Sequence, residues 1–354
     1  MSGPPDRGLR PRLAAVARLG RLGALAVTGY LAYLAVRGSR LLVQPLVREF
    51  VPWIEGQPST PGDLGLDWEP IAFRAADRVA LHGWLVRAQR QTDATVVLLH
   101  GFSGNRLSDL ALYVPWLAAR YNVVQFDFRG HGESEASHVT LGGRERLDVE
   151  AAVDFCRRRG MRPVALYGIS MGAAIAIIAA PDLPVSAVIA DSAYARVRHP
   201  IANRLRMSRY PLAWVGSRAI LAAAALRVRV RLPDPIDRVA AIGPRPLFVI
   251  AARDDPLIHY SESVALHAAA RQPKELWVVD GAGHSQGVVA GGDAYRQRIL
   301  DFLERHLGAE GRHPGAEKEA VDAKEPEPEA ATMGRALRAA AYNPADSAQG
   351  ERDR

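Results

Sequence analysis

The chain has 354 residues, 48% of them hydrophobic and 23% charged, which is the composition of an ordinary globular protein. Its net charge of +7 comes almost wholly from arginine, and the arginines form no basic stripe interleaved with aromatic residues, which argues against nucleic-acid binding. The single cysteine, Cys156, excludes an intrachain disulfide, and the ten dispersed histidines show no metal-ligand spacing, so no metal site is expected.

A basic segment, residues 1–20, precedes a hydrophobic helix expected over residues 21–40. The apolar run within it, residues 22–36, would be about 22 Å long as a helix, against about 30 Å for a bilayer core. A signal anchor, a cleaved signal peptide and a soluble or interfacial helix are three alternatives for this segment. More arginines precede the run than follow it, which favours a cytoplasmic N-terminus and a catalytic domain outside, with a cytoplasmic domain as the alternative.

A linker rich in proline and glycine, residues 41–67, leads to a folded domain expected over residues 68–307. Strand-like and helix-like patterns alternate through this domain. Strands are expected over residues 78–87, 95–99, 121–128, 163–168, 184–191, 245–252 and 274–280, and helices over residues 108–120, 144–159, 171–180, 261–271 and 293–307. Alternation with short connections predicts a parallel sheet covered by helices on both faces.

Two segments depart from this alternation. Residues 195–240 form an insertion with one expected helix over residues 212–228, and the insertion follows the carboxyl end of a strand, where it would suit a small lid. Residues 308–354 are rich in charge and proline and poor in large apolar side chains, so we expect a disordered tail.

The stretch LYGISMGAA, residues 166–174, places Ser170 between two glycines, each two residues away. A strand precedes it and a run of small apolar residues follows it. This pattern is typical of a nucleophile elbow, a tight strand-to-helix turn in which the glycines permit close backbone approach. A glycine-containing loop before a helix is the alternative.

A serine nucleophile needs a base that is held by an acid, and later strands supply both. His284 lies in a glycine-rich loop directly after the strand KELWVVD, and Asp254 and Asp255 directly follow the strand before it. The chain order serine, acid, histidine is the order of this architecture. The local pattern Asp-x-x-apolar favours Asp255 as the acid, with Asp254 as the alternative.

Acyl transfer also needs hydrogen-bond donors for the negative charge that develops on the carbonyl oxygen. One expected donor is the backbone N–H of Met171, directly after the nucleophile and at a helix N-terminus. The other is the backbone N–H of Phe102, in the loop after the strand TVVLL. We expect His100 to be a structural hydrogen-bonding residue, and the turn containing Gly130 and Gly132 to brace the loops around the site.

The motifs HGFSGN, DFRGHGES, GISMG, RDDPLI and GAGHS together resemble those of the α/β-hydrolase superfamily in its serine esterase and lipase branch. The resemblance covers residues 68–307. It implies a mostly parallel eight-stranded sheet, a Ser-His-Asp triad, an acyl-enzyme intermediate and no cofactor. Ser170 differs from the aspartate of haloalkane dehalogenases and epoxide hydrolases. Ala173 stands where prolyl-oligopeptidase-like peptidases carry a glycine, and His259 where relatives often have proline.

These features predict a serine hydrolase of carboxylic esters, with Ser170 as nucleophile, His284 as proton shuttle and Asp255 as the acid. The apolar insertion and the N-terminal helix, which resembles that of membrane-anchored members, favour a lipophilic ester such as a lysophospholipid or monoacylglycerol. The expected partners are therefore this ester and a membrane. An acyltransferase, a peptidase or amidase, and a non-catalytic binding module are the alternatives.

Overall fold

The computed structural model describes residues 9–44 and 57–308, and in it a single sheet organises the domain. Its strands are β1 (Trp68–Arg74), β2 (Ala80–Val86), β3 (Thr95–Leu99), β4 (Asn122–Phe126), β5 (Val164–Ile169), β6 (Ala187–Asp191), β7 (Leu247–Ala252) and β8 (Lys274–Val279). The strands β3 to β7 are entirely buried, which agrees with their continuous apolar runs.

The strand order is β1-β2-β4-β3-β5-β6-β7-β8. The pairs β1–β2 and β2–β4 are antiparallel, and every other neighbouring pair is parallel. The predicted α/β-hydrolase fold with a mostly parallel eight-stranded sheet is therefore confirmed. Sequence patterns identified seven of these strands and missed β1 as a separate element, because this edge strand contains Pro70 and has no continuous apolar run.

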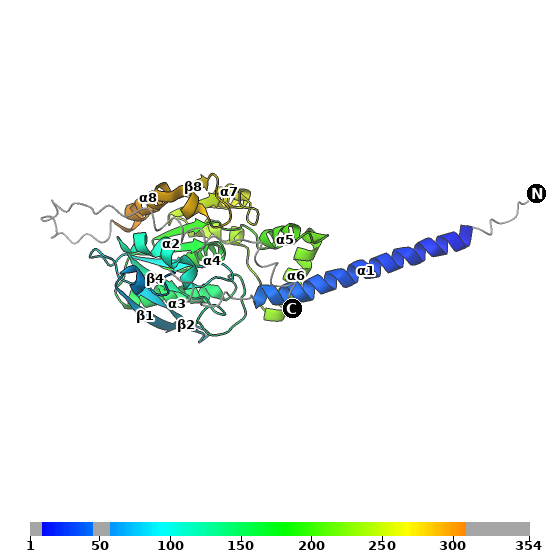
Figure 1. Cartoon of the computed structure of the whole chain (residues 1–354), viewed down its shortest axis with the longest axis horizontal. Helices are drawn as coiled ribbons and strands as arrows, with labels where there is room; N and C mark the ends of the chain where they lie inside the picture. Colours follow the sequence, from blue (N-terminus) through cyan, green and yellow to red (C-terminus); the bar gives the residue numbers. More distant parts are fainter. Residues whose placement is uncertain (1–8, 45–56, 309–354) are drawn as a thin grey trace, which may run out of the picture.

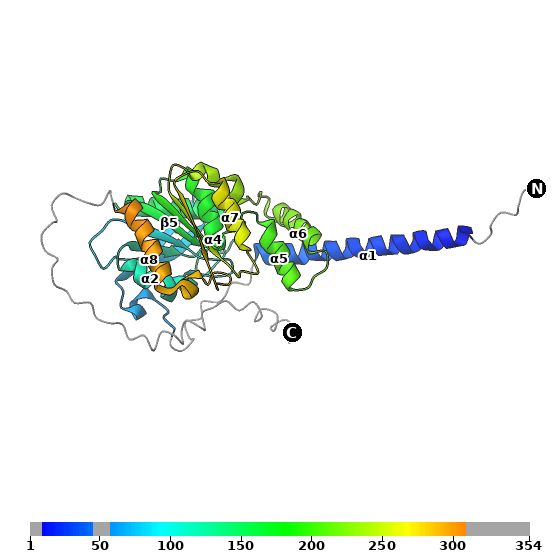
Figure 2. The ribbon, with the colours of Figure 1, turned by 90° about the horizontal axis from the view of Figure 1, so that it is seen from above.

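Helices connect the strands and cover the sheet on both sides (Figures 1 and 2). They are α1 (Leu9–Val43), α2 (Arg106–Ala118), α3 (Glu145–Arg158), α4 (Met171–Ala179), α5 (Arg198–Met207), α6 (Ala213–Val228), α7 (Tyr260–Ala269) and α8 (Gly287–Leu307). The helices α3, α4 and α7 contribute to the core on one face, whereas α2 and α8 contribute to the core on the other. α8 begins earlier than expected because a kink at Gly292 joins a preceding helical turn to it.

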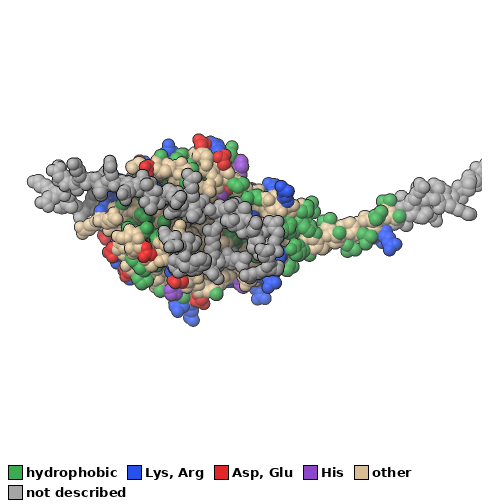
Figure 3. All heavy atoms as spheres, in the orientation of Figure 1, with side chains coloured by type: hydrophobic (Ala, Val, Ile, Leu, Met, Phe, Trp, Pro, Cys, Tyr) green, Lys and Arg blue, Asp and Glu red, His purple; other side chains and the backbone are tan. Residues whose placement is uncertain are grey.

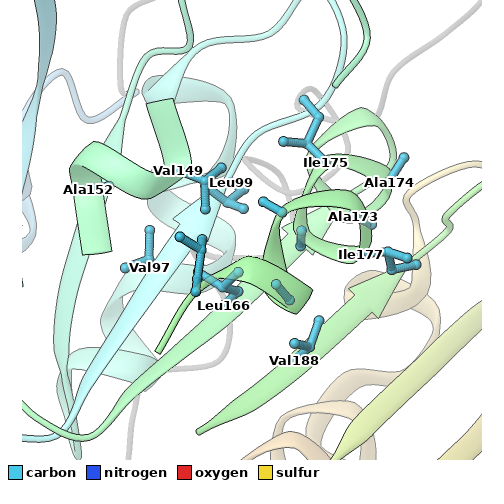
Figure 4. Close-up of a cluster of buried hydrophobic side chains, with 14 of the residues drawn as sticks. Val97, Leu99, Val149, Ala152, Leu166, Ala173, Ala174, Ile175, Ile177 and Val188 are labelled. Carbon is cyan, nitrogen blue, oxygen red and sulfur yellow. The ribbon is translucent and has the colours of Figure 1, made fainter. Parts of the chain in front are cut away.

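Alternate residues of one strand point into the two cores. Val97 and Leu99 of β3 belong to the core that includes α4, whereas Val96 and Leu98 belong to the core that includes α2. Figure 4 shows Ala173 and other small or branched side chains of α4 packed against the sheet. Every residue of α4 is buried, so this helix is fixed tightly at the centre of the domain.

A second, smaller body is formed by α1, α5 and α6. α1 is one continuous helix from Leu9 to Val43 and extends beyond the predicted bounds of 21–40 at both ends. Its C-terminal part packs on α6, where Leu34 is buried with Leu205 and Ile220. Its N-terminal part projects away from the domain (Figure 1). The insertion contains α5 in addition to the helix expected over residues 212–228, which is α6.

The remaining boundary predictions are only partly covered by the structure. Within the predicted linker, residues 45–56 lie outside the described residues, and Pro61–Leu64 form a short 3-10 helix directly before β1. All of the predicted tail after residue 308 also lies outside the described residues.

Two buried arginines hold the loop that follows β4. The Arg129 guanidinium is fully buried and forms ion pairs with Asp148 at 2.7 Å and with Asp77 at 2.6 Å. Arg106 forms ion pairs with Asp127 and with Glu133 in the same loop. The turn around Gly130 and Gly132 is therefore itself held by charge pairs, whereas the sequence prediction was that this turn braces the loops around the site.

His100 connects the ends of β3 and β4. Its Nδ1 lies 2.8 Å from the Gly101 carbonyl oxygen, and its Nε2 accepts a hydrogen bond from the Phe128 N–H at 3.0 Å. This pairing requires a neutral ring that donates through Nδ1. Burial, reinforced by the nearby His131, lowers the pKa of His100 from 6.5 to about 3. His100 is thus a structural hydrogen-bonding residue, as expected.

Replacing Arg129 should unfold the domain far more readily than replacing an exposed arginine. Arg129→Met would leave the buried Asp148 carboxylate without its cationic partner, which costs about 3–5 kcal/mol. The control is Arg159→Met, because Arg159 pairs with Glu69 on the surface, where such a pair contributes at most about 1 kcal/mol. Urea unfolding of both variants beside the wild type gives the comparison. Equal losses would contradict the structural role of Arg129.

His100 should make the fold less stable as the pH falls. Its folded-state pKa is depressed, so below about pH 6.5 the unfolded chain binds a proton that the folded chain rejects. Between about pH 7.5 and about pH 5 this difference removes about 2 kcal/mol of stability.

The His100→Gln variant keeps an acceptor for the Phe128 N–H and has no titrating ring. We expect it to be less stable than the wild type at neutral pH but to lose less stability on acidification. Urea unfolding at both pH values measures this. Burial also raises the pKa values of Asp109 and Asp148 to about 7. Their contributions to the pH dependence of stability are present in both proteins and cancel in the comparison. Parallel pH profiles would contradict the assignment.

Candidate active site

Ser170 occupies a sharp turn between β5 and α4. Its backbone has φ of 54° and ψ of −110°, a strained conformation for a residue with a side chain. A Cβ on Gly172 would lie 2.1 Å from the Leu99 carbonyl oxygen, and one on Gly168 would lie 2.4 Å from the backbone of Gly172. The glycines are therefore required for the close approach of α4 to β3 and to the end of β5. This geometry is that of the expected elbow.

The structure brings the predicted serine, histidine and Asp255 together at the carboxyl edge of the sheet. Ser170 Oγ lies 3.0 Å from His284 Nε2, and His284 Nδ1 lies 2.6 Å from Asp255 Oδ2. Ser170 is 8% exposed, and the His284 side chain is 12% exposed, so neither is completely shielded from solvent. The three side chains follow β5, β7 and β8, which are far apart in sequence.

The two neighbouring aspartates after β7 have different environments. Asp255 is buried, and its second oxygen accepts hydrogen bonds from the N–H groups of Leu257 and Ile258, both at 2.8 Å. These bonds hold the carboxylate with one oxygen free to face His284. Asp254 is exposed, and its backbone N–H donates to the Ala282 carbonyl oxygen in the loop that carries His284.

The two expected oxyanion donors come from two segments that lie next to Ser170, the start of α4 and the loop after β3. Met171 is the first residue of α4, and N–H groups in the first turn of a helix have no partner within that helix. Phe102 follows Gly101, and a Cβ on Gly101 would lie 3.6 Å from Ser170 Cβ. The loop after β3 therefore runs directly beside the serine, while the Phe102 side chain is 38% exposed.

A buried polar network beneath the serine had no role in the sequence analysis. Asp191 ends β6, and its carbonyl oxygen accepts a hydrogen bond from the Ser170 N–H at 2.8 Å. The Asp191 carboxylate accepts hydrogen bonds from Ser192 Oγ at 2.8 Å and from Tyr295 Oη at 2.5 Å. The Tyr295 hydroxyl also lies 2.6 Å from that of Tyr167. The signal in the sequence was an aspartate as the last residue of the strand that neighbours the serine strand.

Burial makes this network costly to ionise. Burial raises the pKa of Asp191, against the hydrogen bond from Tyr295, which lowers it. Burial and the nearby Asp191 raise the pKa of Asp109 to about 7. The hydroxyl groups around Asp191 occupy both of its oxygens, so this carboxylate is not directed at His284.

Within residues 9–44 and 57–308, no cluster of three or more His, Cys, Asp or Glu side chains could hold a metal ion. Cys156 is buried in α3, and burial raises the pKa of its thiol to about 12. A thiol in that environment is a poor nucleophile. At the carboxyl edge of the sheet, a hydroxyl lies next to an imidazole that a carboxylate orients.

Comparison with known proteins places this geometry in a family. Residues 96–294 match the model of the alpha/beta hydrolase family. YfhR of Escherichia coli K12, an uncharacterized protein, is 29% identical over 247 residues, which cover 66% of this chain and 80% of YfhR. YqkD of Bacillus subtilis, also uncharacterized, is 26% identical over 229 residues, which cover 61% of this chain and 73% of YqkD.

Solved structures of two esterases share this fold. An esterase of Pyrococcus furiosus, Pf2001, superposes with a TM-score of 0.61 at 26% identity, over 70% of this chain and 95% of that one. An esterase of Thermogutta terrifontis superposes with a TM-score of 0.51 at 20% identity, over 68% of this chain and 99% of that one, and so shares the fold. The chain therefore belongs to the alpha/beta hydrolase family and is a hydrolase.

Proposed function

We propose that the protein is a serine hydrolase of carboxylic esters that works through an acyl-enzyme intermediate. The observation that carries this proposal is the continuous hydrogen-bonded chain from Ser170 through His284 to Asp255. Ser170 Oγ attacks the acyl carbonyl while His284 Nε2 takes the hydroxyl proton, and Asp255 stabilises the imidazolium that forms. His284 then gives this proton to the departing alkoxide, and the alcohol leaves.

The second half of the reaction repeats these roles with water. His284 takes a proton from water, the resulting hydroxide attacks the acyl-enzyme, and the proton returns to Ser170 Oγ as the acid departs. The backbone N–H groups of Phe102 and Met171 are the proposed donors to the oxyanion in both steps. The position of Met171 at the N-terminus of α4 supports this role, because the helix dipole there favours negative charge.

Similarity to the Pyrococcus furiosus esterase supports an ester as the substrate. The chain's own features support a lipophilic one. α1 contains a stretch, Ala15–Val43, that is long and apolar enough to cross a membrane, and the insertion of residues 195–240 carries exposed apolar side chains. We propose a lysophospholipid or monoacylglycerol as the substrate class, with the insertion acting as a lid.

We further propose that α1 is a retained membrane anchor. A leader that is cleaved off would remove Leu34 and Val43, which are buried against α6. The arginine bias around the apolar run supports a cytoplasmic N-terminus and a catalytic domain on the other side of the membrane.

Removing the serine hydroxyl should abolish ester turnover without unfolding the protein. Ser170→Ala should lower kcat on nitrophenyl esters by at least about 10³-fold and prevent labelling by a fluorophosphonate probe. A series of acyl chains from short to long, assayed with full-length protein in detergent micelles, tests the lipophilic preference. Turnover unchanged in the variant would refute the proposal, and a short-chain preference would refute the lipid substrate class. Added glycerol as acceptor would reveal acyl transfer in place of hydrolysis.

The neighbouring aspartates provide a matched pair for identifying the acid. Asp255→Asn removes the charge that faces His284 Nδ1 and should lower kcat by about 10⁴-fold, because the imidazole then adopts the wrong tautomer. Asp254→Asn alters an exposed carboxylate one residue away and should change kcat little. Nitrophenyl ester kinetics on both variants make the comparison. A larger loss in Asp254→Asn would transfer the role to Asp254.

A further inference from the structure

The turn between α5 and α6 lies directly beside α1. The Tyr30 hydroxyl of α1 donates a hydrogen bond to the Pro211 carbonyl oxygen in this turn at 2.8 Å. Further along, a Cβ on Gly216 would lie 2.8 Å from a methyl group of Leu34, and one on Gly38 would lie 2.6 Å from Ile220. α6 therefore runs parallel to α1, starting from the level of Tyr30.

Tyr30 lies within the apolar run of α1, residues 22–36. Residues 15–29 are all exposed, so this part of the helix makes no packing contact that buries it. The apolar run continues to Val36, which is beyond the point where α6 begins to cover α1. When the whole apolar run lies in a membrane, the membrane surface extends as far as the α5–α6 turn.

The side chains that the turn exposes are suited to a membrane interface. Large apolar and aromatic residues are exposed there by 38–48%: Met207, Tyr210, Leu212 and Val215. Figure 3 shows hydrophobic side chains gathered where α1 leaves the body of the molecule. In a soluble domain these side chains would cost hydration free energy, and at a bilayer surface they would be buried.

The charge of this part of the protein complements anionic lipid. Residues 192–233 contain nine arginines and no aspartate or glutamate, and residues 9–43 of α1 also contain arginines but no acidic residue. Arg206 and Arg209 are exposed next to the apolar side chains of the turn. Exposed arginines beside aromatic and aliphatic side chains are the composition of an interfacial segment.

We infer that the α5–α6 turn, residues 207–215, inserts its apolar side chains into the surface of an anionic lipid bilayer next to α1. This inference rests on the proposed anchoring by α1. The lid thus contacts the membrane through both α1 and the α5–α6 turn. The turn enters the headgroup region, whereas the sheet domain remains in water.

Contacts of α5 connect this surface to the candidate active site. Asn203 Nδ2 of α5 donates to the Leu257 carbonyl oxygen at 2.9 Å, and the Leu257 N–H donates to Asp255. His199 Nδ1 lies 2.6 Å from Glu262 of α7. A lid that is docked on the bilayer therefore holds the acid loop from the membrane side, which places the site next to a supply of lipid esters.

Cysteine variants that carry an environment-sensitive fluorophore test the inference. Leu212→Cys probes the turn, and Leu226→Cys is the matched control, because it is an exposed leucine at the other end of the same helix, about 21 Å away. Leu25→Cys probes the free part of α1. The native Cys156 is buried and should not react. The full-length variants are labelled with nitrobenzoxadiazole and reconstituted into vesicles of phosphatidylcholine and phosphatidylglycerol in equal amounts.

Lipids that carry a nitroxide on the acyl chain then quench fluorophores that lie in the bilayer. We expect strong quenching at positions 25 and 212, none at position 226, and weaker quenching at position 212 in pure phosphatidylcholine. Quenching at position 25 but not at 212 would overturn the inference and leave the anchor standing. No quenching at position 25 would overturn both. The readout needs no turnover, so loss of the proposed esterase activity would be seen separately in the nitrophenyl ester assay.

Discussion

The close approach of α4 to β3 is the constraint on which the site depends. With no Cβ on Gly172, the helix lies against the Leu99 carbonyl oxygen and begins at the residue after the serine. The chain must then reverse direction within Ser170 itself, which explains the positive φ of a residue that normally avoids it. The strain is maintained because every side chain of α4 is buried, so the helix cannot move outward without exposing apolar surface. Packing energy in the core thus fixes the position of one hydroxyl group at the edge of the sheet.

Several carboxylates lie near the carboxyl edge of the sheet, and partners of different kinds compensate their negative charge. Asp127 and Asp148 are paired with buried arginines, whereas Asp191 is surrounded by hydroxyl donors. Asp255 differs from these three because its side-chain partner, His284, also contacts the Ser170 hydroxyl. The arginine and hydroxyl partners keep one protonation state throughout and therefore serve the shape of the loops. The proposed chemistry is confined to the one carboxylate whose partner contacts the serine.

Sequence alone predicted most of the sheet, because buried parallel strands appear as short apolar runs between helical patterns. It also predicted which loops meet, since the carboxyl ends of parallel strands share one edge. It favoured Asp255 over Asp254 only by a local pattern, because both follow the same strand and their different burial and contacts appear only in the structure. The network of Asp191 and Tyr295 was missed for another reason: its members are 104 residues apart and have no motif in common. The length of α1 was underestimated because arginines on both sides end its apolar run without ending the helix.

The hydrophobic cores of the molecule differ in size, and this difference bears on how the proposed lid would work. The sheet has two large cores, whereas the α1, α5 and α6 body has two small clusters around Leu34 and Val43 and only partly buried contacts with the sheet core. Elements with few buried contacts open at lower free-energy cost than a central sheet. The lid can therefore adjust more easily than the sheet, and its position, which reaches the acid loop through Asn203 and Leu257, depends on whatever holds α1. In the proposed function that support is the bilayer, so the same helix that anchors the enzyme would also set the height of its lid above the lipid.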